Sequence, residues 1–103
     1  MSILQEVLKE EIQRLEKNVS SYERMLESLP KGSIFVRKMG GSSFVYRRRR
    51  ENDRIISEYL GNINESYAQK QIELSEEYKR IKQNVRATKV ELLKLQKAYR
   101  IYE

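Results

Sequence analysis

The residues that interrupt regular structure are confined to the middle of this chain. The only proline is Pro30, and the four glycines are Gly32, Gly40, Gly41 and Gly61. Proline and glycine are the strongest local breakers of helices and strands, so the segments on either side can form long uninterrupted elements. The sequence therefore predicts three parts: two long flanking elements and a central segment with several turns.

Both flanks carry the seven-residue apolar repeat of a coiled coil. In the first flank, the apolar positions are Leu8, Ile12, Leu15, Val19, Tyr22, Leu26 and Leu29. In the second, the repeat runs through Tyr67, Gln71, Leu74, Tyr78, Ile81, Val85, Thr88, Leu92, Leu95, Tyr99 and Tyr102. Steps that alternate between four and three residues keep one stripe of a helix facing a partner. We predict helices over residues 2–29 and 62–102.

The ends of both helices have recognisable signals. Ser2 followed by Gln5 resembles a capping box, which satisfies free backbone groups at a helix start. Pro30 and Gly32 end the first helix. For the second helix, we expect Asn62 with Glu65, or alternatively Asn64, to form the cap.

The central segment is predicted to form three short strands. We predict strands over residues 33–39, 43–49 and 54–60, joined by a two-residue turn at Gly40-Gly41 and a polar turn over residues 51–53. We expect Gly61 to break the chain before the second helix. The predicted fold is α+β, mainly α: an antiparallel, coiled-coil-like helical hairpin with a three-stranded antiparallel β-meander between its helices. We expect residues 1–103 to form a single domain.

The lengths of the two turns fix which strand residues face each other. Two-residue turns pair Val36 with Val45 and Phe35 with Tyr46. They also pair Tyr46 with Tyr59, Arg47 with Glu58, and Val45 with Leu60. One face then collects aliphatic residues, namely Ile34, Val36, Val45, Ile56 and Leu60. The other collects Phe35, Phe44, Tyr46 and Tyr59, interleaved with Arg37, Arg48 and Arg50.

Positive charge is concentrated in the predicted meander. Residues 31–60 carry eight basic and three acidic side chains. Arginine binds phosphate through two parallel hydrogen bonds, and aromatic rings stack on bases. The candidate nucleic-acid-binding residues are Arg37, Lys38, Phe44, Tyr46, Arg47, Arg48, Arg49, Arg50 and Arg54. Three alternative roles for these charges stay open: keeping a sheet edge from pairing, ion pairs of Glu58 with Arg47 and Glu51 with Arg54, and binding to an acidic protein or a membrane surface.

The unequal helix lengths predict self-association. The first helix is about 40 Å long and the second about 60 Å, so an antiparallel hairpin leaves about 20 Å uncovered. We expect this overhang at the C-terminus, where Leu92, Leu95, Tyr99 and Tyr102 would form the interface of a homodimer with a four-helix bundle. The alternative is a frayed C-terminus.

Composition narrows the classes of function. The chain has no cysteine, no histidine and one aspartate, so we expect no catalytic residues, no metal site, no cofactor and no small-molecule substrate. The longest apolar run is far below the roughly 20 residues that span a bilayer, and no signal peptide is visible. We expect a cytoplasmic protein that binds and does not catalyse.

The middle of the chain resembles an element of small uncharacterised bacterial and archaeal proteins. The residues that carry this resemblance are Pro30-Lys31-Gly32-Ser33, Phe44-Val45-Tyr46-Arg47 and Ile56-Ser57-Glu58-Tyr59-Leu60-Gly61. Those proteins also place a basic three-stranded meander between two helices, and the resemblance implies no activity. The meander is also similar to the DNA-binding arm domain of phage-type integrases, and the helix–hairpin–helix layout resembles prefoldin subunits.

Two main hypotheses of function follow. One is an oligomeric helical hairpin whose basic β tip contacts nucleic acid. The alternative is a structural or protein-interaction coiled coil with no role in nucleic-acid binding. A third hypothesis is attachment to anionic lipid through the basic stretch Lys79, Arg80, Lys82, Arg86 and Lys89.

Overall fold

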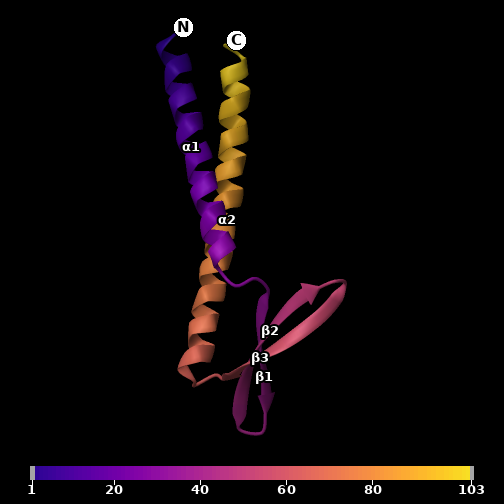
Figure 1. The fold of residues 1–103 in the computed structure, drawn as a ribbon. Coiled ribbons are helices and arrows are strands. Elements are labelled where there is room, and N and C mark those ends of the chain that lie inside the picture. Colours follow the sequence, from indigo (N-terminus) through magenta and orange to yellow (C-terminus); the bar gives the residue numbers. More distant parts are fainter. Residues whose placement is uncertain (1, 103) are drawn as a thin grey trace. The chain divides into compact units, whose positions relative to one another are not determined.

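The fold consists of two long helices on either side of a three-stranded antiparallel sheet. The computed structural model describes residues 2–102. In chain order the elements are α1 (Ile3–Ser28), β1 (Ser33–Met39), β2 (Ser42–Glu51), β3 (Arg54–Asn62) and α2 (Ser66–Arg100) (Figure 1). The predicted α+β class and the helix–meander–helix order are therefore confirmed.

These elements fall into two compact units. The first contains α1 and the part of α2 from Arg80 onward, and the second contains residues 29–79, with the sheet and the first turns of α2. Helix α2 thus contributes to both units. The prediction of one domain over residues 1–103 stays a prediction.

In the first unit, α1 and the C-terminal part of α2 pack along the predicted seam. Leu15 and Val19 of α1 and Ile81 and Val85 of α2 are buried. The start of α1 also matches the prediction, because the Gln5 backbone N–H donates to the Ser2 hydroxyl at 3.1 Å.

The helices of the first unit run antiparallel, and the predicted C-terminal overhang is wrong. The Gln5 side-chain amide donates to the Tyr102 carbonyl oxygen at 3.4 Å, so the N-terminal end of α1 lies beside the C-terminal end of α2. Tyr99 likewise lines one surface groove together with Ile12 of α1. The helical residues beyond the first unit are instead the first turns of α2, which belong to the unit of the sheet.

In the second unit, the strands are ordered β1-β2-β3, and the register largely follows the two predicted turns. Val36 faces Val45 and Phe35 faces Tyr46, as expected from the Gly40-Gly41 turn. Tyr46 faces Tyr59, as expected from the turn at Asn52 and Asp53, both of which have positive φ. The predicted meander is thus confirmed in order and in most of its register.

The predicted pairing of Val45 with Leu60 is wrong, because β3 contains a bulge. Val45 faces Gly61, and the register shifts between Val45 and Tyr46, so Leu60 is an extra residue on β3. Gly61 therefore lies inside β3 and does not end the strand. Its φ of +132° is open to glycine at little cost and strained for other residues.

The second helix begins later than predicted. The Asn62 side chain accepts a hydrogen bond from the Asn64 backbone N–H at 3.0 Å, and its carbonyl oxygen accepts one from Glu65 N–H at 2.9 Å. These bonds form a turn, and α2 starts only at Ser66. An asparagine that bonds its own following backbone stabilises turns as well as helix starts, so the sequence signal was ambiguous.

The core of the second unit joins the sheet to the first turns of α2. Val45 and Ala68 are fully buried and Leu60 nearly so, with Ile34, Ile63 and Ile72 packed around them. The predicted seam put Tyr67 at a packing position, but its side chain is exposed. The sheet covers this part of α2, and the small side chain of Ala68 lets the two approach closely.

Candidate nucleic-acid interface

Three aromatic rings form a row across the sheet, one from each strand. Phe35 of β1 faces Tyr46 of β2, which faces Tyr59 of β3. Directly paired residues point to the same face of a sheet, and here the rings touch. The Phe35 and Tyr46 ring centroids are 5.2 Å apart with planes 13° from parallel, and those of Tyr46 and Tyr59 are 5.5 Å apart at 56°. We call these three rings the aromatic row.

Further aromatic and cationic groups flank this row. The Phe44 ring lies 6.2 Å from that of Tyr59. The guanidinium carbon of Arg48 lies 4.6 Å from the Phe35 ring centre, and that of Arg37 lies 5.8 Å from the Tyr46 ring centre. Both are within the range in which an arginine and a ring attract each other. The face therefore combines flat apolar groups with planar cations.

The aromatic row lies on the face of the sheet opposite to the core. Val45 and Leu60 point to the other face, where they pack with Ala68 of α2. On the aromatic face, Tyr59 is 55% exposed, and the arginines Arg37, Arg48 and Arg50 are also exposed. Phe35 and Tyr46 are half-buried and stack on each other, and Phe44 is half-buried beside Tyr59. This arrangement agrees with the predicted division into an aliphatic and an aromatic face, although Val36 of the aliphatic face remains exposed.

Arg47 is a structural residue. Its side chain is only 11% exposed and lies 3.7 Å from the Glu58 carboxylate. Its guanidinium also donates a hydrogen bond to the side-chain oxygen of Gln71, a buried residue of α2. Arg47 thus ties the sheet to α2 through Gln71. Its ion pair with Glu58 of β3 is one of the alternatives that the sequence left open.

The alternation of the strand divides the remaining basic candidates between the two faces. Arg37, Arg48 and Arg50 lie on the aromatic face, whereas Lys38, Arg49 and Arg54 lie on the face of Arg47. Glu51 was expected to pair with Arg54, but its carboxylate lies 3.5 Å from Arg49. Of the nine predicted residues, five share the aromatic face: Arg37, Phe44, Tyr46, Arg48 and Arg50.

Three residues that contact the predicted site residues were not themselves predicted to belong to it. Phe35 and Tyr59 complete the aromatic row, and the predicted register had already placed both on this face. Gln71 is the partner of Arg47. In the sequence, Gln71 stands out as a polar residue at a heptad position that is otherwise apolar. A buried amide at such a position needs a hydrogen-bond partner, which here is Arg47.

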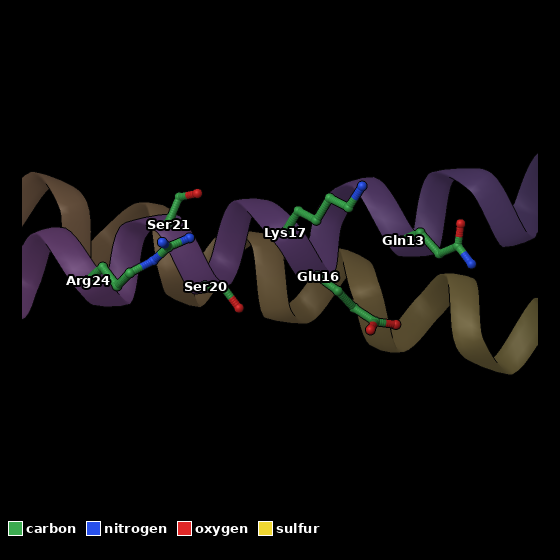
Figure 2. Close-up of a pocket in the computed structure, with 6 residues that line it drawn as sticks. All are labelled: Gln13, Glu16, Lys17, Ser20, Ser21 and Arg24. Atoms are coloured by element: carbon green, nitrogen blue, oxygen red, sulfur yellow. The ribbon is translucent and has the colours of Figure 1, made fainter.

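The surface of α1 has a shallow depression that is not a comparable site. Six polar residues line it, all from α1: Gln13, Glu16, Lys17, Ser20, Ser21 and Arg24 (Figure 2). Every residue that lines the depression belongs to α1, so no second element faces them across it and the depression is open. We therefore place the candidate site on the sheet.

Residues 2–102 contain neither a cluster of metal-binding side chains nor a membrane-spanning helix. In this range, no group of three or more acidic, histidine or cysteine side chains is placed to hold a metal ion. Within the same residues, no helix combines the length and apolar character needed to cross a membrane.

The fold and this surface define a class: α+β proteins in which two helices bracket a basic three-stranded meander. The chain belongs to the family described as Domain of unknown function (DUF6788), whose model matches residues 4–69, more than half of the chain. The matched region covers α1, all three strands and the first turn of α2, and so includes the whole aromatic face. No curated protein and no solved structure matches the chain.

Proposed function

We propose that this protein is a non-enzymatic binding protein that contacts nucleic acid through the aromatic face of its sheet. The observation that carries the proposal is the grouping of the aromatic row with Arg37, Arg48 and Arg50 on the face opposite to the core. Three exposed arginines on one small sheet face have no buried structural role like that of Arg47.

The chemistry of this face suits nucleic acid better than other anionic partners. Arginine offers a planar fork of donors that matches a phosphate group. Aromatic rings can also stack on the bases of a nucleic acid. The carboxylates of an acidic protein surface make no such contact. Phosphate contacts provide affinity that falls steeply with added salt, because each contact releases condensed counterions.

Two triple variants test the proposal while removing the same charge. The test variant replaces Arg37, Arg48 and Arg50 with glutamine. The matched control replaces Lys38, Arg49 and Arg54, which lie on the other face of the same sheet, also with glutamine. Fluorescence polarisation with labelled oligonucleotides, over a series of salt concentrations, gives the affinity and its salt slope for both.

The proposal predicts that the test variant loses most of its affinity and that its salt slope falls by about one for each phosphate contact removed. The control variant should lose only the smaller part of the affinity that comes from the overall positive charge of the protein. Equal losses in the two variants, or no binding by the unaltered protein at low salt, would overturn the proposal.

A second proposal concerns self-association, and it rests on the thin core of the first unit. Its buried apolar residues are Leu15, Val19, Ile81 and Val85, while Val7, Val90 and Leu93 remain about half exposed. Helix α1 carries six acidic and four basic residues, whereas residues 80–102 carry seven basic and one acidic. Within the chain this complementarity already brings Lys89 to 3.9 Å from Glu23. The proposal is that the exposed apolar residues recruit a second copy, with α1 of one copy packing on α2 of the other, including Leu92, Leu95, Tyr99 and Tyr102.

Analytical ultracentrifugation tests the homodimer. The proposal predicts a dimer at micromolar concentration that dissociates when Val90 and Leu93 are both replaced with glutamate. A monomer at high micromolar concentration would contradict it.

A further inference from the structure

We infer that the ligand of the aromatic face is single-stranded nucleic acid, with a base stacked on the exposed ring of Tyr59. This inference rests on the proposed function and deepens it. The rings lie on the face of the sheet opposite to the core, and Tyr59 on that face is 55% exposed.

Stacking requires access to the flat faces of the bases. In a duplex, neighbouring base pairs cover these faces, and a protein reaches only the base edges in the grooves. In a single strand, bases can splay out and stack on aromatic side chains or arginine planes. The Phe35 and Tyr46 rings stack on each other at 5.2 Å, so each covers a face of the other, whereas the Tyr59 ring is tilted by 56° to Tyr46 and is 55% exposed. Tyr59 therefore offers a ring face to a base of a single strand.

Tyr59 is the ring best placed to receive a base. It is 55% exposed, lies on the outer strand β3, and contacts both Tyr46 and Phe44. Arg48 lies over Phe35 at 4.6 Å and Arg37 lies near Tyr46, so a planar cation stands close to each of the other two rings. A base on Tyr59 would have guanidinium groups nearby for its phosphates.

A direct test compares a single strand with a duplex of the same sequence and length at the same salt concentration. We expect the single strand to bind at least about 10-fold more tightly. Duplex binding that is equal or tighter, and that still depends on Arg37, Arg48 and Arg50, would overturn this inference and leave the proposed function standing. Failure to bind either form would overturn both.

Substitutions of Tyr59 test the stacking itself. Tyr59→Ala should weaken single-strand binding by about 5- to 100-fold, while Tyr59→Phe retains it, since stacking needs the ring and not the hydroxyl. The salt slope should stay unchanged, because no phosphate contact is removed. Tyr67→Ala is the matched control, since Tyr67 is 57% exposed and lies on α2, away from the row. Equal effects of the two alanine variants would contradict stacking at Tyr59.

A spectroscopic reporter gives a second readout. The chain contains no tryptophan, so Tyr59→Trp introduces a single one. Stacking predicts that its fluorescence is quenched when an unlabelled single strand is added, and that the duplex has little effect. Unchanged emission at saturating single strand would contradict the inference.

Discussion

At the scale of single residues, neighbouring arginines of one strand have different roles. Arg47 is 11% exposed, donates a hydrogen bond to Gln71 and forms an ion pair with Glu58, whereas Arg48, the next residue, lies over Phe35 on the other face. Successive side chains of a strand point to opposite faces, so a run of four arginines cannot act as one patch. The sequence predicted this alternation, and in the structure α2 covers the aliphatic face, on which Arg47 also lies.

The structural role of Arg47 leads to a prediction about stability. Arg47→Ala should lower the free energy of unfolding by about 1–3 kcal/mol, because the buried amide oxygen of Gln71 loses its donor. Arg49→Ala should cost no more than about 1 kcal/mol, since its ion pair with Glu51 is half exposed to solvent. Urea denaturation of both variants measures the difference, and equal losses would contradict the role given to Arg47.

The conformation of Gly61 leads to a second prediction at this scale. A β-carbon at this position would lie 2.6 Å from a carboxylate oxygen of Glu65, and the φ of +132° is strained for any other residue. Gly61→Ala should therefore destabilise the protein by about 1–3 kcal/mol. Gly41→Ala is the control, because nothing lies within 4 Å of its added carbon. A thermal melt in which both variants behave alike would show that the bulge tolerates a side chain.

At the scale of elements, turn chemistry predicted the strands well. The two-residue turns at Gly40-Gly41 and Asn52-Asp53 fixed the pairing of Phe35, Tyr46 and Tyr59, and therefore the aromatic row. The bulge at Leu60 could not be predicted in the same way. A glycine near a strand end is compatible both with a chain break and with a bulge, and the packing of Leu60 against Ala68 decides between them.

The contact between the sheet and α2 leads to a prediction about packing. Ala68 is fully buried between Val45 and Leu60, so Ala68→Leu should overfill this core and cost about 1–3 kcal/mol. Gln69→Leu places the same side chain on an exposed neighbouring position of α2 and should change stability by less than about 0.5 kcal/mol. Denaturant midpoints of the two variants test this, and a stable Ala68→Leu protein would mean that this core is loosely packed.

At the scale of the whole molecule, the heptad pattern predicted both helices and their antiparallel packing, but not what covers the first turns of α2. The predicted C-terminal overhang depended on α1 covering α2 from the first residue of α2 onward. In the structure, the first turns of α2 pack on the sheet, and α1 reaches the C-terminal end of α2. An apolar stripe indicates that one face of a helix is buried, but it does not indicate whether another helix or a sheet covers that face.

The central claim is that the aromatic face of the sheet binds nucleic acid, and NMR spectroscopy tests it most directly. In a titration of the isotope-labelled protein with a short single strand, the claim predicts that the largest chemical-shift changes occur at Phe35, Arg37, Phe44, Tyr46, Arg48 and Tyr59. Ala68 and Gln71, on the opposite side of the sheet, should change little. Shifts concentrated on residues 80–100 of α2, with the sheet unperturbed, would contradict the claim.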